Sequence, residues 1–197
     1  MKKLAILSLF ILLISCSKDE STVQGLKTFA AADIYTVSSE DGMNYSRGSL
    51  IGNAAIEYQD SVITMTVNVS NMEPNTSHAM HLHMGSLDQP GHHWNQGTTI
   101  FRFCNARSLG KVWAKPFAGD VGNIDIDEDG NGTFTMETDL WAIGTNDNKD
   151  ISGTVLYIHH MSEDFIAECD PNHDHDHGHT NMKIAGGTIV FGSQVLN

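Results

Sequence analysis

Histidine side chains are the residues of this sequence best suited to chemistry. His81 and His83 stand two residues apart, so on a β-strand both imidazoles project from the same face. A second pair of histidines stands at residues 92–93. A third pair, at residues 159–160, ends a separate apolar run. Several imidazoles on β-structure, with no matching cysteine pair, favour a copper or zinc site. The alternative is a set of histidines that are individually hydrogen-bonded or lie at the surface.

The elements that must position these histidines are predicted to be β-strands. Ile63, Met65, Val67 and Val69 alternate with polar residues, which is the two-residue period of a half-buried strand. The sequence shows no long helical period, and Gly, Asn and Asp mark turns between short β-rich runs. Eight strands are expected near residues 29–36, 49–58, 61–70, 77–84, 120–126, 132–138, 153–160 and 184–192. This count predicts an all-β barrel or sandwich.

Two long segments, residues 85–119 and 161–183, do not fit the strand pattern and are expected to be loops. The second loop contains a tract of alternating histidines, which could capture copper or zinc or could be a solvated tip. The first loop carries four basic residues and could supply a local positive field, or could be no more than a soluble loop. The tract consists of His173, His175, His177 and His179, and the basic residues are Arg102, Arg107, Lys111 and Lys115.

Composition limits the classes of function. The chain has 197 residues, which is one ordinary domain, and a formal charge of −13. So acidic a chain is a poor partner for nucleic acids, whose binding depends on clustered Lys and Arg.

The N-terminus is predicted to be a targeting signal. Residues 1–15 read as a secretory signal, because the apolar run is shorter than the roughly twenty residues of a membrane span. Leu13-Ile14-Ser15-Cys16 resembles the lipobox of bacterial lipoproteins, which implies cleavage before Cys16 and lipid attachment to it. An ordinary signal peptide with an incidental cysteine is the alternative. We expect a tether over residues 16–27 and a domain over residues 28–197. The lipid anchor would place the protein in the cell envelope. The outer membrane is favoured because Ser17 stands where an aspartate would retain a lipoprotein in the inner membrane.

The remaining cysteines, Cys104 and Cys169, form an even pair. In an oxidising compartment a disulfide between them is the default, and two buried free thiols are the alternative.

Five segments in order resemble the copper/zinc superoxide dismutase family. His78-Ala-Met-His81-Leu-His83 resembles the family's H-x-x-H-x-H strand, and residues 91–95 resemble its G-P-H-F-N segment. Residues 119–123, 153–159 and 184–189 are similar to its G-D-L-G-N strand, its fourth-ligand strand and its L-A-C-G-V-I strand.

The resemblance implies an eight-stranded Greek-key β-barrel with two long loops. It also implies a copper site made by His81, His83, His93 and His159, with His78 supporting it from behind. The implied activity is dismutation of superoxide to O₂ and H₂O₂, with His93 carrying a proton. A homodimer is left open.

Two departures from the family matter. In the family, the loop after the histidine that faces both metals supplies two further histidines for zinc, followed by an aspartate. The segment from Trp94 to Gly119 contains no His, Asp or Glu, so Asp120 alone remains of that set. Since zinc normally takes four ligands, a copper-only member is expected, with zinc unlikely. Lys183 stands where the family places an arginine beside copper; it keeps the charge but loses the planar geometry, so activity could be weaker.

Two other functions stay open. A non-catalytic copper-binding or copper-delivery lipoprotein would keep the barrel and its histidines. A structural β-domain of the CHRD type is the other possibility, because its A-H-I-H-x-G segment is similar to His81-Leu-His83-Met-Gly85. This possibility leaves His93 and His159 unexplained.

Overall fold

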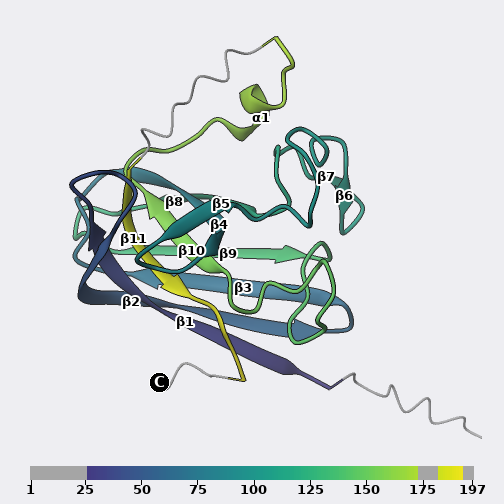
Figure 1. Ribbon diagram of the computed structural model, residues 1–197, viewed down its shortest axis with the longest axis horizontal. Helices are drawn as coiled ribbons and strands as arrows, with labels where there is room; N and C mark the ends of the chain where they lie inside the picture. Colours follow the sequence, from purple (N-terminus) through teal and green to yellow (C-terminus); the bar gives the residue numbers. More distant parts are fainter. Residues whose placement is uncertain (1–25, 173–181, 193–197) are drawn as a thin grey trace, which may run out of the picture.

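The fold is a curled antiparallel sheet with almost no helix, seen in a computed structural model that describes residues 26–172 and 182–192 (Figure 1). The predicted signal segment, Cys16, most of the predicted tether and the histidines of the tract lie outside the described residues. Within the described residues no helix has the length and apolar character of a membrane span.

All eight predicted strands are present, and the all-β prediction is confirmed. They are β1 (Thr28–Ser38), β2 (Ser46–Gln59), β3 (Val62–Val69), β4 (Ser77–Gly85), β8 (Asp120–Asp125), β9 (Gly132–Thr138), β10 (Val155–His159) and β11 (Lys183–Thr188). The main sheet runs in the order β5-β4-β10-β11-β1-β2-β3-β9, in which β5 is Pro90–His93. In addition, β8 pairs with β4, and β12 (Val190–Phe191) pairs with β1. A bridge between Ile126 and Gly132 joins the β8 and β9 ends, so the sheet curls around a core.

The predicted alternation positions the core. Ile63, Met65, Val67 and Val69 of β3 are buried, while the threonines between them face outward. On β4 the apolar Met80 and Leu82 belong to this core. His81 and His83 of β4 therefore project from the opposite, outer face of the sheet, which is also buried and must be covered by other parts of the chain.

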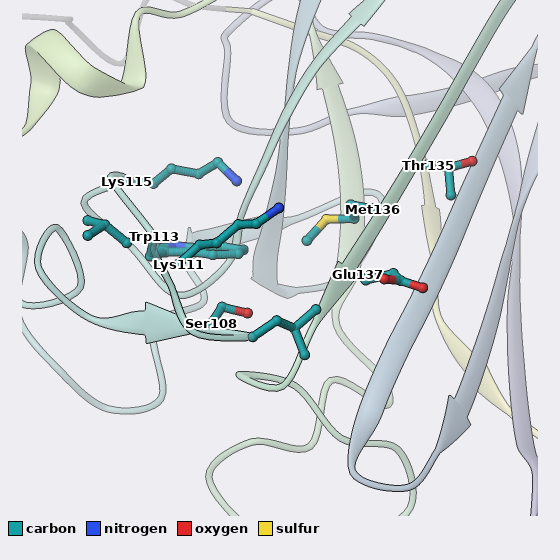
Figure 2. Close-up of a pocket in the computed structure, with 9 residues that line it drawn as sticks. Ser108, Lys111, Trp113, Lys115, Thr135, Met136 and Glu137 are labelled. Atoms are coloured by element: carbon teal, nitrogen blue, oxygen red, sulfur yellow. The ribbon is translucent and has the colours of Figure 1, made fainter.

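The two predicted loops contain more structure than expected. Residues 85–119 include β5 (Pro90–His93), which pairs with β4, and a small hairpin of β6 (Arg107–Ser108) and β7 (Lys111–Val112). A pocket between this hairpin and β9 is lined by Lys111, Trp113 and Met136, among others (Figure 2). Residues 161–172 include the short helix α1 (Phe165–Glu168). Elements of two to four residues are too short to show a period, so the sequence did not predict them.

A disulfide joins these two segments. Cys104 in the first segment is bonded to Cys169, the C-cap residue of α1, with Cα atoms 5.7 Å apart, so the predicted pairing is confirmed. The bond ties together two segments that contain little regular structure of their own.

We expect the double variant Cys104→Ser/Cys169→Ser to be less stable than the wild type. The bond closes a loop with a sequence separation of 65 residues. In the chain-entropy model such a cross-link contributes about 4 kcal/mol by restricting the unfolded chain. Urea unfolding of the two proteins measures the difference, and an unchanged midpoint would show that the bond does not constrain the unfolded chain.

Candidate metal centre

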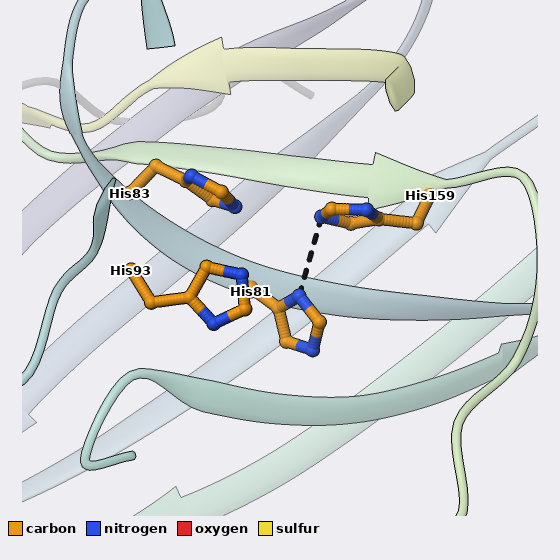
Figure 3. Close-up of side chains that lie close together, drawn as sticks. All are labelled: His81, His83, His93 and His159. Atoms are coloured by element: carbon orange, nitrogen blue, oxygen red, sulfur yellow. Dashed lines mark hydrogen bonds between the residues drawn. The ribbon is translucent and has the colours of Figure 1, made fainter. Parts of the chain in front are cut away.

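Four histidines from three strands converge on one point. His81 and His83 come from β4, His93 ends β5, and His159 ends β10. The pairing of the strands brings them together, because β4 pairs with β10 on one edge and His83 lies opposite His93 on the other. One ring nitrogen from each histidine lies within 4.8 Å of the others (Figure 3). These are the four residues expected as ligands.

The spacing of the nitrogens suits a metal ion. His81 Nδ1 lies 3.2 Å from His159 Nε2, and two nitrogens bound about 2 Å from one ion lie roughly this far apart. Burial lowers the pKa of His81 to about 3, helped by the charges of Lys183 and Lys115. Burial also lowers the pKa of His83 well below its ordinary value. Both rings are therefore neutral at pH 7, which is the form that binds metals.

Contacts behind the rings fix which nitrogen faces the cluster. His83 Nδ1 lies 2.9 Å from the carbonyl oxygen of Gly91, an acceptor, so this nitrogen carries the proton and donates it. His83 Nε2 then carries a lone pair, is buried, and has no hydrogen-bond partner in the described part of the chain. A buried lone pair that faces three other imidazoles fits a metal ion.

Glu163 holds His81 in the same way. Its Oε2 lies 3.0 Å from His81 Nε2, which leaves Nδ1 facing the cluster. Asn123 fixes the backbone of Glu163 through two hydrogen bonds: Asn123 Nδ2 donates to the Glu163 carbonyl at 2.9 Å, and Glu163 N donates to Asn123 Oδ1 at 3.0 Å. The sequence analysis missed Glu163. Its only signal was its position four residues after His159, in a segment interpreted as a loop.

Three other histidines are placed differently. His78 lies behind the cluster, with Nδ1 2.9 Å from the carbonyl oxygens of both His159 and His160, as expected of a supporting residue. His92 and His160 are exposed, and neither belongs to the converging group.

In the described part of the chain, the far side of His93 has only a few of the residues expected for a zinc ion. Asp120 Oδ1 lies 3.9 Å from His93 Nδ1 and 4.0 Å from His81 Nε2, so the retained aspartate is at the expected place. The ring of Phe117 packs against His93 with centroids 4.9 Å apart. The segment from Trp94 to Gly119 provides no further His, Asp or Glu, and its one cysteine is in the disulfide. Of the residues expected to bind zinc, His93 and Asp120 are present, and two ligands are too few for the usual four-ligand site of zinc.

Lys183 places a positive charge beside the cluster. It lies opposite His159 in the register of β10 and β11. Its Nζ lies 5.6 Å from the ring centre of Tyr157 and 5.8 Å from that of Tyr45. Burial lowers the pKa of Lys183, and its charge helps to lower the pKa values of His81 and His83, as expected of a cation near both rings.

Several solved structures of other proteins are similar in fold to this chain. A crystal structure of a point mutant of a SOD-like protein from Bacillus subtilis has a TM-score of 0.58 at 18% identity, covering 81% of this chain and 97% of that chain. The Cu/Zn superoxide dismutase from Brucella abortus has a TM-score of 0.54 at 15% identity, with coverages of 83% and 99%. The clock protein EA4 has a TM-score of 0.54 at 19% identity, with coverages of 82% and 93%. At these identities the similarity shows a shared fold.

No curated protein matches the chain significantly. The family model described as copper/zinc superoxide dismutase matches residues 50–189, which include all four converging histidines, Asp120 and Lys183. The chain therefore belongs to the copper/zinc superoxide dismutase family.

Proposed function

We propose that the protein is a copper-dependent superoxide dismutase of the bacterial cell envelope. The observation that carries the proposal is the convergence of four imidazoles on one point in a member of this family. Imidazole ligands suit copper, and copper binds most tightly among the divalent metals of its row. The histidine cluster fits copper, whereas the expected zinc position lacks ligands.

Copper bound by the four histidines would supply one-electron chemistry, oxidising one superoxide to O₂ and reducing a second, with two protons, to H₂O₂. The protein must then hold the ligands, attract an anion and deliver protons. Glu163 and the Gly91 carbonyl perform the first task, because their hydrogen bonds fix His81 and His83. Lys183 supports the second, because its ammonium group lies near the cluster on a chain of charge −13.

His93 is the residue we assign to proton delivery. Its side chain is 27% exposed, whereas the other three cluster residues are nearly inaccessible to water. Its Nδ1 faces Asp120, so Nε2 is the atom that would bind copper, and it would carry a proton to the reacting anion while it is released from copper.

A non-catalytic copper-binding or copper-delivery protein is the second candidate. It is favoured by one observation, that the cation beside the cluster is Lys183, which cannot hold an anion by two points as an arginine can.

We expect His83→Ala to lower copper affinity at least 100-fold and to reduce superoxide removal to background. The reason is that this change removes a buried ligand with a free lone pair. His92→Ala is the matched control, since His92 is exposed and outside the cluster, and it should keep both properties. Metal analysis measures copper binding, and pulse radiolysis measures superoxide removal. Tight copper binding without superoxide removal by the wild type would support copper binding alone, and unchanged binding by His83→Ala would reject this site.

Lys183→Met should slow superoxide removal by about tenfold and flatten its dependence on salt, because it removes the charge that attracts the anion. Lys183→Arg should keep the rate. Lys27→Met, which removes a charge paired with Glu57, should change neither the rate nor its salt dependence. Rates measured against ionic strength decide the question: a wild-type rate that is independent of salt would contradict attraction by Lys183.

We also propose that the protein is anchored by lipid at Cys16 after removal of residues 1–15. The support is the lipobox-like sequence, and the disulfide between Cys104 and Cys169 is consistent with an oxidising compartment. In cell fractionation the wild type should be found with membranes and Cys16→Ser should not carry lipid. Equal membrane association and mass for the two proteins would contradict the anchor.

A further inference from the structure

The pocket between the β6–β7 hairpin and β9 is separate from the histidine cluster. None of the four converging histidines lines it. Its volume of about 460 Å³ lies in the range of sites that hold small organic molecules. Met136 and Glu137 of β9 form one wall, and the hairpin with the residues that follow it forms the other (Figure 2).

Hydrogen bonds hold the hairpin wall in place. Ser108 Oγ and Thr138 Oγ1 share a 2.8 Å hydrogen bond, and the Leu109 amide donates a 3.2 Å hydrogen bond to Asp139 Oδ1. Trp113, which follows β7, is buried in the core. The pocket is therefore largely formed before a ligand binds, so little binding free energy is lost in ordering it.

Two residues of the hairpin wall have a costly backbone conformation. Leu109 has a φ of 49° and Ala114 a φ of 55°, which is the left-handed region that residues with a β-carbon rarely adopt. Leu109 begins the two-residue turn between β6 and β7, where asparagine or glycine is usual. The side chain of Leu109 lines the pocket, as does that of Lys115, which follows Ala114. Backbone strain of this kind gathers at sites that hold a ligand.

Two ammonium groups face the pocket from this wall. Figure 2 shows the side chains of Lys111 and Lys115 both pointing toward Met136. Lys115 Nζ lies 3.8 Å from the centre of the Trp113 ring and donates a 3.1 Å hydrogen bond to the Val121 carbonyl. Since an ammonium group has three donors, it can still donate to a ligand. Within the part of the chain that the structure describes, no carboxylate lies within ion-pair distance of either lysine.

The rest of the lining indicates what kind of anion fits. Leu109 is 41% exposed and Val112 is 53% exposed, so apolar surface is available for a ligand to cover. Glu137 is the one carboxylate of the lining, and with two lysines against it the lining has a net charge of +1 on a chain of −13. This combination fits a molecule with a single anionic group and an apolar body.

We propose that this pocket binds a small organic carboxylate. The carboxylate group lies between the ammonium groups of Lys111 and Lys115. The apolar body covers Val112 and Met136 beside the Trp113 ring. The site does not depend on copper or on dismutase activity, because no histidine of the cluster lines it.

Calorimetric titration of the wild type with 2-naphthoate tests the proposal. One molecule per chain should bind, with the same affinity whether or not copper has been added. The neutral analogue 2-naphthalenemethanol and the small anion acetate should each bind at least tenfold more weakly, because each lacks one half of the recognised chemistry. No saturable binding of 2-naphthoate, binding that requires copper, or equal binding of the neutral analogue would overturn the proposal.

Variants locate the bound molecule. Lys111→Met should weaken 2-naphthoate binding about tenfold, because it removes one of two charge-assisted hydrogen bonds. This lysine is exposed, so the change should leave the fold intact. Arg102→Met is the matched control: it removes one exposed positive charge from the same segment but lies outside the pocket lining, and it should leave the affinity unchanged. An unchanged affinity for Lys111→Met, or an equal loss in both variants, would overturn the assignment to this pocket.

Discussion

The structure depends on bringing four buried imidazole lone pairs to one point. Without a cation between them, neutral nitrogens that face one another at 3.2 Å gain little, and at most one can donate a proton to its neighbour. The fold nevertheless buries three of these residues almost completely. The protons of His83 and His81 are directed outward, to the Gly91 carbonyl and to Glu163, so the arrangement is built to receive a metal ion.

Regular structure supplies the position of the ligands, and irregular structure supplies their surroundings. Strand pairing between β4, β5 and β10 sets the place of each histidine, because register fixes which residues lie opposite one another. The segments that the disulfide joins provide Phe117 and Glu163, and the first residue of β8 provides Asp120. These side chains surround the outward edges of the rings. The bond between Cys104 and Cys169 links these segments, so the stability of the cover and the geometry of the ligands are coupled.

Much of the fold and of the histidine site could be predicted from the sequence, because both depend on local patterns within strands. The alternation along β3 and the His-x-His spacing of β4 are local patterns. A strand preserves them because its side chains alternate between two faces. Glu163 was not assigned a role in the site, because it acts from an irregular segment whose path depends on the disulfide and on hydrogen bonds with Asn123. Such paths result from tertiary contacts, which leave no period in the sequence.

The most direct test of the account is the spectrum of copper bound to the purified chain. Electron paramagnetic resonance and X-ray absorption of protein loaded with copper(II) report how many ions bind and which atoms surround them. The account predicts one copper per chain with four imidazole nitrogens in its first coordination shell, contributed by His81, His83, His93 and His159. Copper held mainly by oxygen or sulfur, or by fewer than three nitrogens, would contradict it.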